Sequence, residues 1–492
     1  MNLQDSAHQR ESARKKAVKS KQNNYVIRID DSPLAVNGLA WNTLLAAQSA
    51  DGLLNPFMRH EYLAALHTSG SAVPKTGWTP QFLTMWDGET LAGACALYRK
   101  AHSYGEYVFD WAWANAYQQN GLDYYPKALV AVPFTPVPGA RLLARNPQER
   151  ALLVKAVVAW CEREKLSSLH LLFASEPDVT ACNEAGLLLR HTVQFHWTNR
   201  APTLPASRGA LPPEGAAAPA VRPNQSRGPG LHEGDDHAPA DSESPLLQLR
   251  EDRDADLPEL ALPLRQFGSF DEFLMTLSQE KRKKIRQERR KVQDAGITFR
   301  WSLGKDICPA DWDFFYRCYE RTYLEHGNAP YLSRDFFRRM ERTMPESWLL
   351  FVAEHSGLPV ASSLIAVSAR SDCAESQIDA INQPPQAQNL VAYGRYWGAL
   401  ARVDCLHFEA CYYQPLQWCI AHGFHRFEGG AQGEHKMARA LLPVKTTSAH
   451  WLAHPSFADA IERFLEREGA GIDNYLDELG QRSPFKAPTG PV

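Results

Sequence analysis

The sequence predicts a mixed α/β fold in two halves, each with helices and strands in alternation. Its 492 residues are enough for two or three domains. Residues 203–258 contain no Phe, Trp or Tyr and are rich in Pro, Ala, Gly and Asp, so they cannot bury enough apolar surface to form a core. On each side of this segment, a hairpin is followed by an amphipathic helix and a strand. These observations predict two related α/β units joined by a linker.

The domain boundaries follow from changes in composition. Residues 1–23 are basic and almost free of apolar side chains, which predicts a solvated tail. We expect the first domain at 24–202, the linker at 203–258, the second domain at 259–485 and a short tail at 486–492.

The overall composition is that of a soluble globular protein, with 44% hydrophobic and 22% charged residues. The net charge of −3 gives no general affinity for nucleic acid. A membrane span needs about 18 or more consecutive apolar residues, and the sequence has no such stretch and no apolar secretion signal. We therefore expect a cytoplasmic protein without integral membrane segments, whose nine cysteines are reduced.

Hydrophobic periodicity and turn residues predict the individual elements. In the first half these are a strand from Tyr25, a helix at 55–66, hairpin strands at 81–86 and 91–99, a helix at 147–165 and a strand at 169–173. The second half repeats this order. Its expected elements are a helix near 269–294, a strand at 297–303, helices at 310–325 and 333–343, hairpin strands at 348–354 and 360–367, a helix at 411–422 and a strand at 424–428.

The predicted helix at 269–294 carries a dense row of cations opposite its apolar stripe. Its cations are Lys281, Arg282, Lys283, Lys284, Arg286, Arg289, Arg290 and Lys291. Like charges one helical turn apart repel each other, and a bound anion relieves this repulsion. The helix therefore predicts a phosphate-bearing ligand, with a solvated face as the alternative. DNA is not an expected partner, because the chain has no further basic and aromatic motif.

Residues 406–443 combine a strand, a glycine-rich segment and several ionisable side chains. Glycines directly after a strand let the backbone approach a ligand, and donors of the turn can bind an anion. This makes Gly430, Gln432 and Gly433 candidate ligand contacts. Groups able to deprotonate an amine lie in the same stretch, namely His407, Glu409, Glu428, Glu434 and His435. A plain turn with structural hydrogen bonds is the alternative.

Two aromatic segments are further candidates for ligand binding. Arg395, Tyr396 and Trp397 follow a predicted strand at 375–381, and rings beside an arginine suit a phosphate and a flat or sugar ring. Core packing of Tyr396 and Trp397 is the alternative. The stretch at 101–143 fits either a binding groove or an irregular core. It is rich in aromatics and prolines and contains His102, Glu106, Asp110, Lys127 and Arg141.

Metal and serine chemistry are not expected. Cysteines and histidines crowd residues 405–435, but none has the spacing of a zinc motif, and HExxH is missing. The sequence also has no GxSxG.

Several motifs together resemble a known family. They are PFMRHEYLAAL, KAHSYGEYVFDWAWANAY, YYPKALVAVPFTPVPGARLL, KRKKIRQERRKV, YGRYWGA, LHFEACYYQPLQWCIAHGF, FEGGAQGEHKMARALLP and SAHWL. These stretches resemble the peptidoglycan biosynthesis/recognition proteins of the Fem-like branch of the GNAT acyltransferase superfamily. They cover both halves and leave out the basic tail and residues 203–258.

The resemblance implies two tandem GNAT-like domains, each with a mixed, mainly antiparallel sheet flanked by helices. It implies transfer of an acyl or aminoacyl group to an amine, from acyl-CoA or aminoacyl-tRNA, with a peptidoglycan precursor as an acceptor. Under this hypothesis Glu428 or Glu409 is the base, and Lys436 neutralises charge as a lysine after the glycine-rich strand does in Fem-like domains. The cations expected to bind phosphates are Lys284, Arg286 and Arg290. The alternative is a non-catalytic module that recognises a cell-wall precursor.

Overall fold

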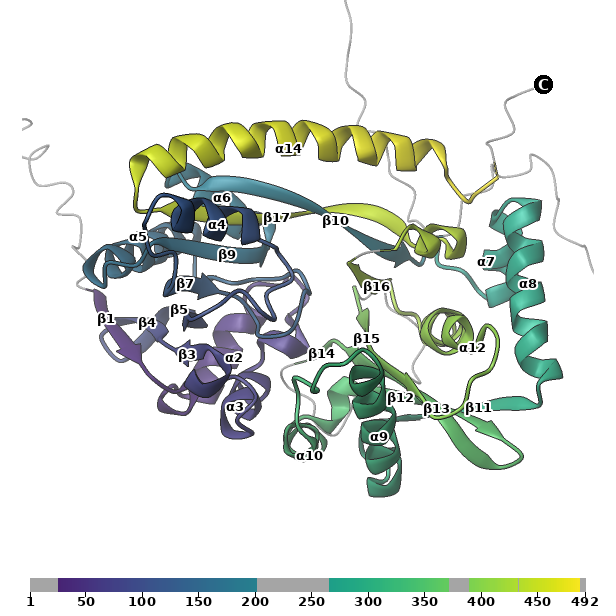
Figure 1. Cartoon of the computed structure of the whole chain (residues 1–492). Coiled ribbons are helices and arrows are strands. Elements are labelled where there is room, and N and C mark those ends of the chain that lie inside the picture. The colour runs from purple at the N-terminus through teal and green to yellow at the C-terminus, as the bar shows by residue number, and fades with distance from the viewer. Residues whose placement is uncertain (1–24, 201–264, 371–388, 432, 487–492) are drawn as a thin grey trace, which may run out of the picture. The chain divides into compact units, whose positions relative to one another are not determined.

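A computed structural model describes four stretches of the chain (Figure 1). They are residues 25–200, 265–370, 389–431 and 433–486. These stretches belong to one compact unit. The predicted basic tail, the linker at 203–258, the predicted strand at 375–381, Gln432 and nearly all of the short tail lie outside the described residues.

Most strands belong to one 11-stranded sheet that runs through both halves of the sequence, in the order β11-β12-β13-β15-β16-β10-β17-β9-β7-β6-β3 (Figure 1). The second half contributes β11 (Ile297–Leu303), β12 (Trp348–His355), β13 (Leu358–Val367), β15 (Val391–Ala399), β16 (Arg426–Ala431) and β17 (Leu442–Leu452). The first half contributes β3 (Trp78–Pro80), β6 (Leu97–Lys100), β7 (Lys127–Val130), β9 (Ser168–Ala174) and β10 (Leu188–Thr198). Only β15 with β16 and β7 with β9 pair in parallel in this sheet, which confirms the prediction of a mainly antiparallel mixed fold.

The two halves exchange strands at the centre of this sheet. First-half strand β10 lies between β16 and β17, and second-half strand β17 lies between β10 and β9. The register pairs His196 with Glu428, and Leu188 with His450. Side chains alternate between the faces of a strand, so positions 188 and 196 share a face. Glu428, His196 and His450 therefore lie on one face of the sheet.

Two smaller sheets complete the strands. One contains β1 (Tyr25–Asp30), β4 (Phe82–Asp87), β5 (Thr90–Cys95) and β8 (Leu143–Ala144), and the other pairs β2 (Leu53–Leu54) with β14 (Ala369–Arg370). The predicted first strand and both predicted hairpins are confirmed, as β1, the β4–β5 pair and the β12–β13 pair.

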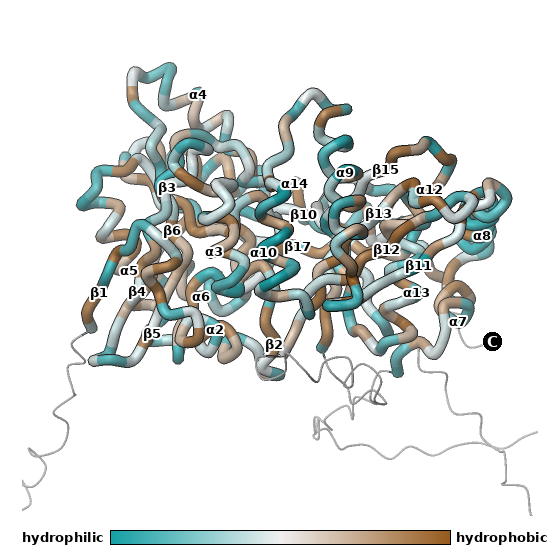
Figure 2. Tube along the Cα trace, turned by 90° about the horizontal axis from the view of Figure 1, so that it is seen from below, coloured by the Kyte–Doolittle hydropathy of each residue, from teal (hydrophilic) through white to brown (hydrophobic). Residues whose placement is uncertain are grey.

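Helices flank the sheets, and their apolar faces form the cores. The first-half helices are α2 (Gly38–Ala46), α3 (His60–Thr68), α4 (Trp111–Gln119), α5 (Pro147–Arg163) and α6 (Glu176–Glu184). The second-half helices are α7 (Phe270–Thr276), α8 (Gln279–Asp294), α9 (Pro309–Glu325), α10 (Arg334–Thr343), α12 (Leu406–Phe408), α13 (Gln414–Ala421) and α14 (Pro455–Gln481). One core joins both halves, because Tyr62 on α3 packs with Phe336 on α10 and with Tyr396 on β15. α8 is hydrophilic along most of its length (Figure 2).

The prediction of one helix over 269–294 is wrong, because the chain breaks at Leu277. Leu277 is extended (φ −78, ψ 156), fully buried, and forms a bridge with Phe485. Ser278 then caps α8 by accepting from the N–H of Lys281. The capping box at the start is confirmed in part, since Ser269 accepts from Glu272 N–H but the Glu272 carboxylate accepts from Gly268. The free energy gained by burying Leu277 therefore exceeds the cost of interrupting the helix.

The predicted loop of glycines after residue 428 is in fact part of β16. Gly429 allows close packing, because a Cβ there would lie 3.0 Å from the carbonyl O of Phe195. Gly430 has φ +75 at the register shift between β10 and β16, a conformation that glycine adopts without strain. The helix before this strand also starts earlier than expected, at Leu406, and contains a π-helical turn at Glu409–Tyr413.

Candidate active site

Glu428 is a buried carboxylate near the centre of the shared sheet, only 4% exposed. Arg426 lies two residues earlier on β16, and its Nη2 is 2.9 Å from Glu428 Oε1. Oε2 has no hydrogen-bond partner among the described residues. Burial raises the pKa of Glu428 to about 7, and the positive charges of Arg426 and Arg141 limit this rise. The carboxylate can therefore take up and release a proton near neutral pH.

Strand β10 places neutral polar groups next to this carboxylate. His196 pairs with Glu428 across the two strands. Burial, together with Arg426 and Lys436, lowers the pKa of His196 to about 3, so its imidazole is neutral. Its Nε2 lies 3.3 Å from Oε1 of Gln194, whose Nε2 donates to the carbonyl O of Pro136 at 2.8 Å. These contacts connect β10 to Pro136, which lies in the first-half segment that precedes Arg141 in the sequence.

Arg141 brings a buried guanidinium from the first half towards Glu428. Its Nε donates to the carbonyl O of Leu172 at 2.9 Å, and its Nη2 donates to the carbonyl O of Val137. Nη1 has no partner among the described residues, although Arg141 is only 1% exposed. Burial lowers the pKa of Arg141 to about 10, against the attraction of Asp178 and Glu428. An N–H donor and a carboxylate acceptor are thus both buried here without a hydrogen-bond partner.

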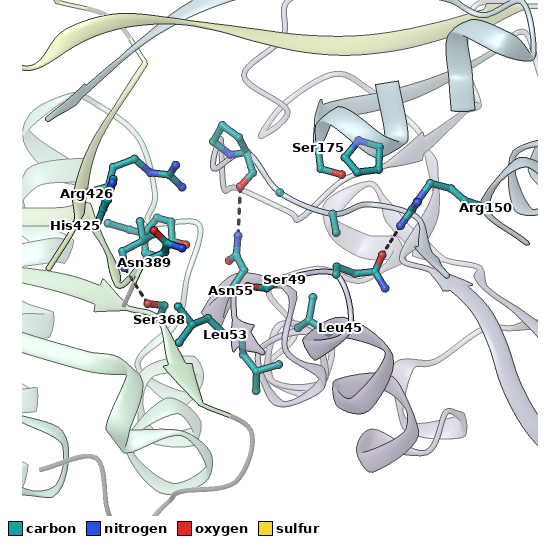
Figure 3. A pocket seen from close by; sticks show the side chains of 18 residues that line it. Leu45, Ser49, Leu53, Asn55, Arg150, Ser175, Ser368, Asn389, His425 and Arg426 are labelled. Atoms are coloured by element: carbon teal, nitrogen blue, oxygen red, sulfur yellow. Dashed lines mark hydrogen bonds between the residues drawn. The ribbon is translucent and has the colours of Figure 1, made fainter. Parts of the chain in front are cut away.

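A cavity of about 350 Å³ has walls from both halves (Figure 3). Its lining includes Arg426, the partner of Glu428, and Ala140, which precedes Arg141, but neither Glu428 nor Arg141 lines it. Arg426, which is paired with Glu428, forms part of one side, and Arg150, bonded to Gln48, lies on the other. Asn55 donates to the carbonyl O of Pro138 at the wall. Other polar lining residues are Ser49, Ser175, Ser368, Asn389 and His425. No described lining residue is acidic, so the cavity suits a polar or anionic ligand.

Lys436 and Arg395 are two predicted site residues whose charges act on each other. Lys436 is 5% exposed, and its Nζ lies 3.2 Å from the carbonyl O of Gly430. Burial and the charge of Arg395 lower the pKa of Lys436 to about 8. Arg395 donates from Nη2 to the carbonyl O of Phe134 at 2.8 Å, and surrounding tyrosines raise its pKa against the effect of burial. Lys436 thus contacts β16 at Gly430, two residues after Glu428, and its charge acts on His196, which pairs with Glu428.

The aromatic pair on β15 serves the core rather than an exposed surface. Tyr396 is 6% exposed and its hydroxyl is 3.3 Å from that of Tyr62. Trp397 is half-buried, with its ring 5.5 Å from that of His407.

Gly433, with φ +97, begins the short helix Glu434–Arg439 that carries Lys436.

Glu409 and His435 belong to a different cluster, between α8 and the π-helical turn. Glu409 is as buried as Glu428, but its carboxylate is 3.0 Å from Nη2 of Arg289 and accepts from Gln414 at 2.8 Å. His435 Nε2 lies 3.4 Å from the hydroxyl of Tyr412, and burial lowers its pKa. Arg289 therefore bonds both carboxylate oxygens of Glu409, whereas Arg426 pairs with Oε1 of Glu428 and leaves Oε2 without a partner among the described residues.

The predicted phosphate-binding cations lie on the exposed face of α8. Lys284, Arg286 and Arg290 are exposed, and Arg286 makes only a loose 3.8 Å ion pair with Asp271. Arg286 and Arg290 line a surface recess of about 360 Å³, which shares no lining residue with the cavity beside Arg426. The structure thus separates the cations of α8 from Glu428.

A second buried polar cluster lies mainly in the first half and is here called the first-half cluster, with His450 joining it from second-half strand β17. It comprises Glu106, Asp110, Tyr124, Lys127, His170 and His450. Lys127 is fully buried and donates to Glu106 at 2.8 Å and to Asp110. Tyr124 donates to Asp110 at 2.6 Å and lies 3.1 Å from His170, which meets His450 at 2.8 Å. None of the described cavities is lined by these six side chains.

Sequence reasoning named Glu428, Lys436 and Arg395 as site residues, which stays a prediction, and it named Arg141 only within a long aromatic stretch. It did not name Asn55 and Arg426, which line the cavity, or His196 and Gln194 on β10. No local motif marks these four residues, because strand exchange and contact between the halves bring them together. In the described parts of the chain, no three Cys, His, Asp or Glu side chains are placed to hold a metal ion. No described helix is long and apolar enough to span a membrane.

Comparison with known proteins identifies the family. The FemAB-like family, described as peptidoglycan biosynthesis/recognition, matches residues 34–203 and 261–487. The chain belongs to this family, which confirms the resemblance predicted from its motifs. No curated protein matches the sequence.

Several solved structures are similar to this chain at low identity. FemX is 8% identical, with 87% of this chain and 98% of that one covered and a TM-score of 0.43. L-PGS from Bacillus licheniformis is 9% identical, with 84% and 97% covered and a TM-score of 0.40. A tandem GNAT protein from the clavulanic acid biosynthesis pathway is 11% identical, with 88% and 99% covered and a TM-score of 0.38.

Proposed function

We propose that this protein transfers an acyl or aminoacyl group to an amine, and that Glu428 is the base. The observation that carries the proposal is a buried carboxylate with one unpartnered oxygen and a pKa of about 7, next to a polar cavity. Such a group matches the requirement for a general base at neutral pH. The family description supports a role in peptidoglycan biosynthesis or recognition.

The reaction would proceed without a covalent enzyme intermediate. The acceptor nitrogen attacks the donor carbonyl and forms the new N–C bond, while Glu428 Oε2 takes the proton that the nitrogen loses. The bond from the carbonyl carbon to the leaving sulfur or oxygen then breaks. Lys436, with a pKa of about 8, is mostly protonated at pH 7 and stabilises the negative charge that develops. Catalysis rests on positioning and electrostatics.

The finer assignments are part of the same proposal. Two GNAT-like domains, 24–202 and 259–485, would share the sheet by strand exchange, and chemistry would occur in the second. The donor would be acyl-CoA or aminoacyl-tRNA, with its phosphates on Lys284, Arg286 and Arg290 of α8. The acceptor would be an amine of a peptidoglycan precursor in the cytoplasm.

The test compares two buried glutamates. Full-length protein is incubated with acetyl-CoA, a longer acyl-CoA or aminoacyl-tRNA, together with a UDP-linked peptidoglycan precursor, and mass spectrometry follows the acceptor. Removing a general base typically costs about 100-fold or more in rate. We expect Glu428→Gln to lower kcat by that factor, and Glu409→Gln to leave kcat within about threefold, because Glu409 is bound by Arg289.

Full activity of Glu428→Gln would refute the assignment of the base. Precursor binding without any mass gain, with every donor, would instead identify the protein as a non-catalytic recognition module.

A further inference from the structure

Two neighbouring strands that pair in parallel, β15 and β16, form part of the cavity wall. Their register places Val391 opposite Arg426 and Tyr393 opposite Glu428. Side chains alternate along a strand, so these four side chains share one face of the sheet. Val391, Tyr393 and Arg426 line the cavity, whereas Glu428 does not. The strand pair therefore puts two polar lining groups next to a buried carboxylate.

Arg426 is the more accessible of the two arginines in the described lining. Its side chain is 45% exposed, and Figure 3 shows its guanidinium pointing toward the opposite wall. A guanidinium has five N–H donors, and the ion pair with Glu428 engages Nη2. Arg150 differs, because its side chain is 10% exposed and is held by Asp178 and Gln48. Arg426 therefore keeps donors for a ligand, and Arg150 has structural partners.

Tyr393 adds a neutral donor on the same wall. Its ring packs edge-on against that of Phe57, with 5.4 Å between the ring centroids. Burial raises the pKa of Tyr393 against the effect of the Arg426 charge, so the hydroxyl keeps its proton at neutral pH. This hydroxyl forms no hydrogen bond with the part of the chain that the structure describes. A buried hydroxyl without a partner costs free energy, which a ligand oxygen can recover.

A ligand that carries a negative charge would meet both groups, and no described lining residue is acidic. We propose that Arg426 and Tyr393 form a binding subsite for an anionic oxygen of a ligand, on a carboxylate or a phosphoryl group. Because Arg426 also pairs with Glu428, the bound anion and this carboxylate compete for one guanidinium. The subsite concerns binding alone, so it stands if no acyl group is transferred and if Glu428 is not a base.

Titration with two small anions tests the subsite on the full-length protein, with ligand-detected NMR as the measure of affinity. Sulfate represents a phosphoryl group, and acetate represents a carboxylate. Every protein in the series carries Arg286→Gln and Arg290→Gln, because these cations line the separate recess on α8 and would bind the same probes. We expect Arg426→Gln and Tyr393→Phe each to weaken binding about tenfold, the loss of one charge-assisted hydrogen bond.

Arg321→Gln is the matched control and should leave the affinity unchanged. Arg321 is also about half exposed and paired with a glutamate, but it lines none of the described cavities. Tyr393→Phe keeps the ring that packs on Phe57, so it tests the subsite even if Arg426→Gln does not fold. The probe that binds more tightly identifies the anionic group of the ligand.

Glu428→Gln tests the competition for Arg426. The pKa of Glu428 is about 7, so at pH 8 this residue is mostly ionised, and a neutral amide removes the competing charge. We expect the anion to bind several-fold more tightly to this variant, a gain that a merely structural Arg426 would not produce. The subsite is overturned if neither anion binds, or if Arg426→Gln and Tyr393→Phe both bind as tightly as the control. Equal or weaker binding to Glu428→Gln overturns the competition.

Discussion

Two buried polar clusters lie on one face of the shared sheet, and they differ in whether a described cavity adjoins them. In the first-half cluster, Lys127 bonds both carboxylates, and Tyr124 links Asp110 to His170 and His450. Each cluster keeps a carboxylate oxygen without a partner among the described residues, Glu106 Oε1 in one and Glu428 Oε2 in the other. Of these two glutamates, Glu428 has an ion-pair partner, Arg426, that lines a cavity.

This difference separates a structural role from a chemical one. Opposite charges that are buried and bonded to each other, with no described cavity at their side, hold a fold in place. A buried carboxylate whose partner lines a cavity lies near a place where a ligand can bind, and the pKa of Glu428 is in the range where it can exchange protons. The contrast supports the proposal that chemistry occurs at Glu428.

The largest expected effect comes from removing the cation of the first-half cluster. Lys127→Met would leave Glu106 and Asp110 buried without a positive partner, which costs about 3–5 kcal/mol of unfolding free energy. Denaturant unfolding measures this loss. Lys445→Met is the control, because its ion pair with Asp473 is exposed and screened by solvent, so its removal should leave the free energy of unfolding nearly unchanged. If Lys127→Met lost less than about 3 kcal/mol of unfolding free energy and also abolished transfer, the first-half cluster would be catalytic.

A second prediction concerns pH. The folded pKa of Glu428 is raised from 4.5 to about 7, so its contribution to stability is complete below pH 4.5 and is lost as pH rises through 7. Over this pH range the free energy of unfolding falls by about 3 kcal/mol. Glu428→Gln does not titrate, and its stability relative to wild type should therefore rise by about that amount between these pH values. Denaturant unfolding at several pH values measures it.

Glu106 provides the matched comparison, because burial also raises its pKa to about 7. Glu106→Gln should flatten the dependence of stability on pH in the same direction. Only Glu428 should control how activity depends on pH. The kcat/KM of the wild type should rise through pH 7 as this base loses its proton. An unchanged activity profile in Glu428→Gln, or a profile controlled by Glu106, would remove the distinction between the clusters.

The sequence could predict most elements because apolar spacing and turn residues are local signals. It could not predict the exchange of β10 and β17, since periodicity indicates which residues form a strand but not which strand they join. The same limit applied to the site. Glu409 and Glu428 look equivalent as bases in the sequence, and contacts distant in the chain distinguish them, such as that of Glu409 with Arg289, 120 positions earlier. The break at Leu277 was also hidden, because it depends on a contact with Phe485.

The smallest expected effect on stability comes from the exposed face of α8. Lys284→Glu and Arg290→Glu should each change the free energy of unfolding by about 0.5 kcal/mol or less, because both side chains are exposed. The effect of these two substitutions on donor binding decides the role of this helix. If its face holds donor phosphates, calorimetry should show several-fold weaker CoA binding in both variants, with a difference that shrinks at high ionic strength. Equal CoA affinity in wild type and variants would make α8 a solvated face. The donor phosphates would then have to bind elsewhere, and Arg426, which pairs with Glu428 and lines the cavity, is the next candidate.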